Sequence, residues 1–187
     1  MKIILASASP RRQELLRQLG VEFDLHPVAI DERPREGESP SEYVLRLARE
    51  KAVAAFKAHH RPTLGADTVV VVEGEILGKP GLPDEARAML KKLSGKTHEV
   101  YSGVALVTED KTLATFSRTL VTFKRLLEEE IEAYLATGEP FDKAGAYAIQ
   151  GKGAVFVRSI EGSYSGVVGL PLFETAQLFR KIGFRLP

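Results

Sequence analysis

The hydrophobic positions of this chain repeat with a helical period in some segments and run continuously or alternate in others. Spacings of three and four residues place apolar side chains on one face of a helix, and they predict helices over residues 10–19, 39–58, 83–93, 128–136 and 170–181. Alternating or continuous apolar runs are typical of strands, and they cover residues 3–5, 21–28, 63–72, 97–108, 112–124 and 154–157. Helices and strands alternate early and a long hairpin follows, so the order predicts a mixed α/β sheet rather than a purely parallel one.

Neither an internal repeat nor a low-complexity segment interrupts this pattern. The 187 residues suffice for one domain with its own hydrophobic core. We therefore expect residues 1–187 to form a single domain, an elongated twisted sheet flanked by helices, built as two tightly joined lobes.

Composition removes several functional classes. A formal net charge of +1 gives no overall field to attract nucleic acid or an anionic membrane, and no segment approaches the length of a membrane span. The chain has no cysteine, which excludes disulfides, cysteine nucleophiles and cysteine-ligated metal sites. The apolar run after Lys2 is too short for a signal peptide, so we expect a cytoplasmic protein that binds neither nucleic acid nor membrane.

The first strand-to-helix turn carries an unusual concentration of polar groups. Ser9 is placed as the N-cap of the first helix and Pro10 as its first residue. Arg11 and Arg12 then fall in the first turn, where the helix dipole disfavours cations. Together with the free backbone N–H groups and the hydroxyls of Ser7 and Ser9, they favour an anion site, with polyphosphate the obvious ligand. The alternative is that both arginines point into water and pair with acidic neighbours.

Other polar residues extend this turn into a candidate site. The common phosphate-loop, dinucleotide, zinc-protease and serine-hydrolase motifs are missing. The remaining consistent set is a phosphate cradle and two carboxylates, namely Ser7, Ser9, Arg11, Arg12, Lys51 and Lys79 with Glu32 and Asp67. Carboxylates beside phosphate oxygens suit Mg²⁺ or Mn²⁺, and one carboxylate could orient or deprotonate a water. The set indicates metal-assisted hydrolysis of a phosphate ester or anhydride.

Eight segments, in order along the chain, carry a family resemblance. They are LASASPRRQELL, DERP, LAREKA, GADTVV, GKP, KLSGKTH, DKAGAYAIQG and SYSGVVGLPL. Their sequence and order resemble the Maf family of nucleoside triphosphate pyrophosphatases, from Ile4 to about Phe179.

The resemblance implies an activity and an architecture. Members hydrolyse a nucleoside triphosphate between the α and β phosphates with a divalent metal, and the aspartate of the GADT segment, here Asp67, accepts the proton. The implied fold is similar to inosine-triphosphate pyrophosphatases, with the site in a cleft between two lobes. Such proteins are commonly homodimers.

The resemblance also implies a base preference. One subgroup acts on dTTP and UTP and carries the residues found here at Arg12, Thr68 and Gln150. A second subgroup, which acts on 7-methylguanosine triphosphate, has Trp, Gln and Glu at those places. The sequence therefore predicts a dTTP/UTP pyrophosphatase that binds its nucleotide partly through these three residues.

Two other functions share the same phosphate cradle. A non-catalytic nucleotide sensor in cell-division control would need the cradle but not Asp67. A nucleotidyltransferase would break the same phosphoanhydride bond but pass the nucleotide to an acceptor. Release of pyrophosphate without an acceptor separates hydrolysis from both.

Overall fold

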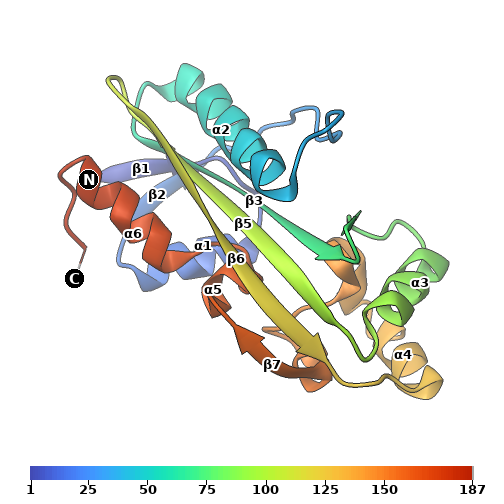
Figure 1. The fold of residues 1–187 in the computed structure, drawn as a ribbon. Coiled ribbons are helices and arrows are strands. Elements are labelled where there is room, and N and C mark those ends of the chain that lie inside the picture. Colours follow the sequence, from blue (N-terminus) through green and yellow to red (C-terminus); the bar gives the residue numbers. More distant parts are fainter. Residues whose placement is uncertain (187) are drawn as a thin grey trace.

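A long twisted sheet runs through the molecule (Figure 1). In the computed structural model, which describes residues 1–186, seven strands form this sheet in the order β2-β1-β3-β5-β6-β7, with β4 paired to β3 beside this path. The strands are Lys2–Leu5 (β1), Glu22–Leu25 (β2), Thr63–Val72 (β3), Glu75–Leu77 (β4), Thr97–Val107 (β5), Thr112–Phe123 (β6) and Val157–Glu161 (β7).

Strand direction follows from what connects the strands. Strand β1 pairs in parallel with β2 and β3, and a helix forms each of the intervening crossovers. The pairs β3–β4, β3–β5, β5–β6 and β6–β7 are antiparallel. The predicted mixed sheet and its long central hairpin are confirmed.

Six α-helices and three short 3₁₀ segments surround the sheet within residues 1–186 (Figure 1). They are Pro10–Gln18 (α1), Pro40–His59 (α2), Pro83–Leu93 (α3), Glu128–Leu135 (α4), Tyr164–Val168 (α5), Leu172–Lys181 (α6), Glu139–Asp142 (η1), Ala144–Ala146 (η2) and Lys152–Phe156 (η3). Ser9 caps α1 and is followed by proline, as predicted from the sequence, and of the two candidate caps of α2, Ser39 and Ser41, it is Ser39 that caps the helix, again followed by proline.

Helix α2 lies directly on the sheet because two glycines remove the side chains between them. A Cβ added at Gly65 of β3 would overlap the carbonyl oxygen of Ala48, and one added at Gly103 of β5 would lie 2.5 Å from that of Val44. Asp67 is two residues beyond Gly65 and therefore faces α2 as well. This close approach brings Lys51 of α2 over Asp67.

Two hydrophobic clusters lie toward opposite ends of the sheet (Figure 1). One packs α3, α4 and η2 around Phe123, and the other packs α1, α5 and α6 around Phe179. Ile149 contacts both clusters. Residues 1–186 contain no helix with the length and apolar character needed to cross a membrane.

Two local predictions near the C-terminus are wrong. The segment expected as a strand over 154–157 is mostly the 3₁₀ segment η3, and the strand follows it as β7. Residues 163–166, whose Ser and Gly composition predicts a turn, instead begin helix α5, where the Ser163 hydroxyl accepts from the Gly166 N–H at 2.9 Å. Elements of five residues are too short to show the period that identifies them.

Candidate active site

The turn between β1 and α1 forms the predicted polar cluster. The Ser9 hydroxyl accepts from the Arg12 N–H at 3.4 Å, and the Ser7 hydroxyl accepts from the Ser9 N–H at 3.2 Å. The next residue is a proline, and its missing N–H costs nothing there because the first helical N–H has no partner within the helix. The local geometry is as the sequence predicts, with both hydroxyls beside the N-terminus of α1.

Arg12 turns into the protein rather than into water. Its Nε donates to the Gly169 carbonyl at 2.8 Å, and its two terminal nitrogens lie 3.3 Å from the hydroxyls of Ser7 and Thr68. Thr68 in turn shares a 2.5 Å hydrogen bond with Ser102. Burial lowers the pKa of Arg12, with the Asp67 charge opposing it, but a guanidinium remains charged at physiological pH. Arg12 therefore ties α1, β3 and the end of α5 together.

Arg11 points elsewhere, into an open cavity. It is half-buried, and its nearest acidic partner is Asp142 of η1, 3.9 Å away. That distance is long for a charge-assisted hydrogen bond. The Arg11 guanidinium is thus available to bind an anion.

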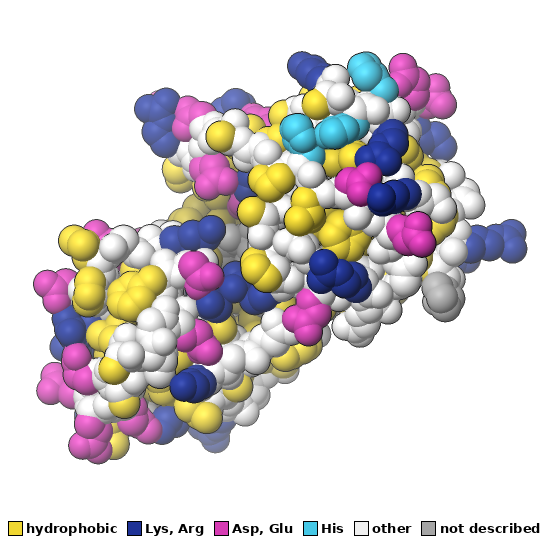
Figure 2. Space-filling view, turned by 180° about the vertical axis from the view of Figure 1, so that it is seen from behind, with side chains coloured by type: hydrophobic (Ala, Val, Ile, Leu, Met, Phe, Trp, Pro, Cys, Tyr) yellow, Lys and Arg dark blue, Asp and Glu magenta, His cyan; other side chains and the backbone are white. Residues whose placement is uncertain are grey.

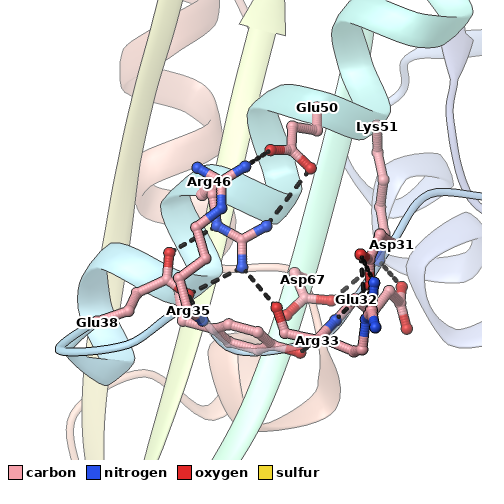
Figure 3. Close-up of polar contacts among 10 residues, drawn as sticks. Asp31, Glu32, Arg33, Arg35, Glu38, Arg46, Glu50, Lys51 and Asp67 are labelled. Atoms are coloured by element: carbon pink, nitrogen blue, oxygen red, sulfur yellow. Dashed lines mark hydrogen bonds and ion pairs between the residues drawn. The ribbon is translucent and has the colours of Figure 1, made fainter.

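Lys51 joins the two predicted carboxylates (Figure 3). Its Nζ lies 2.9 Å from Asp67 Oδ1 and 2.8 Å from Glu32 Oε1. Asp67 is only 8% exposed, and its second oxygen, Oδ2, has no hydrogen-bond partner in residues 1–186. Glu32 lies on the exposed loop before α2, where the Tyr43 hydroxyl donates to its backbone carbonyl at 2.6 Å.

The two carboxylates differ in proton affinity. Burial raises the pKa of Asp67, and the charges of Lys51 and Arg12 offset this only in part. Desolvation also acts on Glu32, but the hydrogen bond and charge of Lys51, with smaller contributions from Lys79 and Arg12, bring its pKa below the ordinary value. Asp67 is therefore the stronger base of the pair, as a proton acceptor requires.

Two adjoining cavities meet at the N-terminus of α1. The first has a volume of about 90 Å³ and a lining of mixed polarity. We call it the apolar cavity after the apolar part of its wall, which consists of Val70, Val100, Tyr147, Ile149 and Val167, and its polar lining includes Thr68 and Gln150. The second is rich in charge and is lined by Ser7, Glu32, Lys51 and Asp142, among others. Ser9, Arg11, Arg12 and Lys79 line both cavities. On the face opposite that of Figure 1, Lys and Arg side chains gather along a hollow in the surface (Figure 2).

Gln150 lies apart from the other two residues linked to base preference. It lines the apolar cavity, but its side chain is exposed and its Nε2 is 3.3 Å from Glu14 Oε2 of α1. Arg12 and Thr68 also line that cavity, next to Gly169. The structure brings all three to one cavity without direct contact between Gln150 and the pair.

The glycine-rich segment contributes residues that the sequence reasoning passed over. Lys143 lines the apolar cavity, and its Nζ bonds the Glu139 carbonyl at 3.0 Å and Asp142 at 2.6 Å. Tyr147 forms part of the wall. Both residues belong to the segment DKAGAYAIQG, from which the sequence predicts only Gln150 as a site residue.

Glu139 fixes the loop that carries Gln150. Its carboxylate accepts from the N–H of Lys152 at 2.9 Å and of Gly153 at 3.1 Å, and from the Tyr134 hydroxyl. A Cβ at Gly151 would overlap this carboxylate, so only glycine permits the contact. These hydrogen bonds hold the backbone just after Gln150, a residue that lines the apolar cavity.

Glu32 and Asp67 are suited to hold a divalent cation together with a bound phosphate. Residues 1–186 contain no group of three or more His, Cys, Asp or Glu side chains arranged around one metal position. Mg²⁺, however, is usually held by one or two carboxylates, with phosphate oxygens and water as its other ligands. Asp67 Oδ2 is buried and has no hydrogen-bond partner among the described residues, so it is an oxygen that a cation entering between Glu32 and Asp67 could bind.

Comparison with known proteins gives a consistent family signal. The sequence model of the family described as "Maf-like protein" matches residues 2–182. A dTTP/UTP pyrophosphatase of Chromobacterium violaceum is 52% identical over 192 residues, which cover 100% of this chain and 97% of the relative. One of Shigella sonnei is 54% identical over 178 residues, covering 94% and 90%.

Solved structures with a related arrangement are more distant. The Ham1 protein of Staphylococcus aureus aligns with a TM-score of 0.47 at 16% identity, covering 66% of this chain and 72% of its own. A nucleoside-triphosphatase (dITP/XTP pyrophosphatase) of Mycobacterium abscessus aligns with a TM-score of 0.43 at 20% identity, covering 67% and 74%.

Proposed function

This chain belongs to the Maf-like protein family, and from that premise we propose that it hydrolyses dTTP and UTP to the monophosphate and pyrophosphate. The single observation that carries this proposal is Asp67, a buried carboxylate with one free oxygen beside a cavity rich in cations. Most buried polar atoms are hydrogen-bonded, so an unpartnered carboxylate oxygen next to a charged cavity marks a position where a ligand could bind. The substrate assignment is supported by relatives that are 52% identical over the whole chain and are named dTTP/UTP pyrophosphatases.

The two cavities divide the nucleotide between them. The triphosphate lies in the charged cavity, where the N-terminus of α1, Arg11, Lys51 and Lys79 supply positive potential. The base and sugar lie in the adjoining cavity, whose valines and Tyr147 exclude water. Arg11 and Lys79, which line both cavities, bind near the junction.

Hydrolysis then needs a proton acceptor and charge stabilisation. Asp67 takes the proton from the water that attacks the phosphoanhydride, and the bond between the α and β phosphates breaks to release pyrophosphate. Arg11, Lys51 and Lys79 stabilise the charge that develops on the departing oxygens. A divalent cation such as Mg²⁺ or Mn²⁺, held by Glu32 and Asp67, would neutralise further phosphate charge.

Base preference arises from Gln150 and from the part of the wall that Arg12 and Thr68 form. Uracil and thymine present an N3–H donor between two carbonyl acceptors, which a carboxamide matches with paired hydrogen bonds. Gln150 lines the cavity, and its amide would turn from Glu14 toward the bound base. Arg12 and Thr68 act by shaping the wall, because their polar atoms are largely engaged by each other, Gly169 and Ser102.

Pyrophosphate release from a panel of nucleoside triphosphates, with Mg²⁺ or Mn²⁺ and no acceptor, tests the proposal. We expect fast release from dTTP and UTP and slow release from purine triphosphates. Binding without release would indicate a sensor, and release only with an added acceptor would indicate a nucleotidyltransferase.

A further inference from the structure

Lys51 occupies the point where the two candidate metal-binding carboxylates meet. Its ammonium lies within 2.9 Å of an oxygen from each of Glu32 and Asp67, which come from separate segments of the chain (Figure 3). The lysine is thus the cation that holds these carboxylates together before any substrate arrives. A divalent ion seeking the same oxygens has to displace it.

The surrounding charges oppose a lone divalent ion. Arg11, Arg12 and Lys79 line the same cavity as Lys51, whereas Glu32, Asp142 and the adjacent Asp67 are the carboxylates at hand. The cations at least balance the carboxylates, so free Mg²⁺ or Mn²⁺ gains little by entering. A triphosphate brings several negative charges and reverses this balance.

Lys51 can leave its position without movement of the fold. Helix α2 is fixed by its close contact with Gly65 and Gly103 of the sheet. The lysine side chain is long and flexible, and it lines the charged cavity. Its ammonium can therefore turn from the carboxylates to phosphate oxygens. Asp67 Oδ2 remains without a partner while Lys51 holds Oδ1, so Lys51 alone leaves the site incomplete.

We propose that Lys51 is a placeholder cation, which blocks divalent metal from Glu32 and Asp67 until the nucleotide draws its ammonium onto the phosphates. This inference rests on the proposed function and adds an order of events to it. The metal binds together with the nucleotide, not before it. Empty enzyme is thereby kept from trapping metal that cannot support turnover.

The test measures Mn²⁺ binding without nucleotide, from the electron paramagnetic resonance signal of free Mn²⁺. We expect weak binding by the wild type and binding at least about tenfold tighter by Lys51→Met, because one cation next to the metal is removed. Lys79→Met is the matched control, since it removes one charge from the same cavity but no contact with a carboxylate. It should tighten binding far less. If both variants tighten Mn²⁺ binding equally, the change in net charge alone explains the effect, and the proposal is overturned.

Thermal melting provides a second readout. Mn²⁺ alone should raise the melting temperature of Lys51→Met, whereas the wild type should respond only when an α,β-methylene analogue of dTTP is also present. Lys51→Gln repeats the measurement if the methionine variant does not fold, and Lys51→Arg should behave like the wild type. Tight Mn²⁺ binding by the nucleotide-free wild type contradicts the inference. Absence of pyrophosphate release would instead contradict the proposed function, so the two failures are distinguishable.

Discussion

Two groups of ion pairs lie next to each other along helix α2, and the central pair of each has a similar exposure but a different number of satisfied oxygens (Figure 3). The Arg46 and Glu38 side chains are 12% and 8% exposed, and those of Lys51 and Asp67 are both 11% exposed. Arg46 binds both oxygens of Glu38, at 2.6 and 2.8 Å, and the Arg33 carbonyl at 3.1 Å. Asp67 keeps one oxygen free.

The difference separates a structural ion pair from the one that we propose to be functional. The Arg46 group ties the loop of residues 31–39 to α2 and leaves Glu38 with both oxygens paired. The Lys51 group leaves Asp67 with one oxygen unpartnered, and a ligand could supply the missing contact. Burial alone does not distinguish the two, whereas the count of satisfied oxygens does.

The largest effect should come from Asp67→Asn. Loss of the proton acceptor should lower kcat for dTTP by about 10²–10⁴-fold, while the nucleotide still binds. Steady-state pyrophosphate release and equilibrium dialysis of the analogue measure both. A near-normal rate in this variant would show that Asp67 is not the proton acceptor. The Lys51–Asp67 pair would then have no catalytic role to set it apart from the Arg46–Glu38 pair.

Replacing a cation of the charged cavity should have the next largest effect. Alanine at Arg11, Lys51 or Lys79 should lower kcat/KM by about 10²-fold, because each stabilises phosphate charge more in the transition state. The loss should be similar for every triphosphate, whatever its base. A changed base preference with activity kept would show that the chosen residue contacts the base instead.

Exchange of the subgroup residues should change preference rather than rate. Arg12→Trp, Thr68→Gln and Gln150→Glu together should favour 7-methylguanosine triphosphate, whose cationic ring stacks on Trp and whose donors match a carboxylate. The pyrimidine preference should fall at least about tenfold, as expected for an unpaired polar group. Gln150→Glu alone is the control. If the triple variant folds, turns over and still prefers dTTP, these residues serve only as packing.

The smallest effect concerns the structural ion pair and depends on pH. The hydrogen bonds of Arg46 lower the pKa of Glu38 to about 2. A depressed carboxylate pKa stabilises the fold above the unfolded value near 4.5, and this contribution is lost as the pH falls toward 2. Glu38→Gln should therefore destabilise the protein by about 1 kcal/mol at pH 7. Urea unfolding should show the difference shrinking at pH 3, and a constant difference contradicts this origin.

Local signals explain what the sequence predicts well. The Ser9–Pro10 cap and the valine run of β3 depend on neighbouring residues and lie where expected. The candidate cations and carboxylates of the site could also be selected from the sequence, since each residue type has a known preference for phosphate or metal.

Long-range contacts explain what the sequence does not predict. The bond from Arg12 to Gly169 joins positions far apart in the chain, and no local pattern indicates it. Lys51 contacts Asp67 only because Gly65 and Gly103 let α2 approach the sheet. Residues expected as a strand over 154–157 form most of η3 instead. Glu139 binds the backbone at the start of this segment, and Phe156 at its end packs into the core. These features depend on tertiary packing, which overrides local propensity.

The most direct test of the account compares Asp67→Asn with Glu38→Gln on the same preparations, for pyrophosphate release from dTTP and for metal-free thermal unfolding. Asp67→Asn should lose at least about 10²-fold in kcat yet melt no lower than the wild type, because a neutral amide is easier to bury than a carboxylate with an unpartnered oxygen. Glu38→Gln should melt lower and keep most of its activity. If Asp67→Asn keeps its activity, or if it loses as much stability as Glu38→Gln, the two ion-pair groups do not differ as proposed.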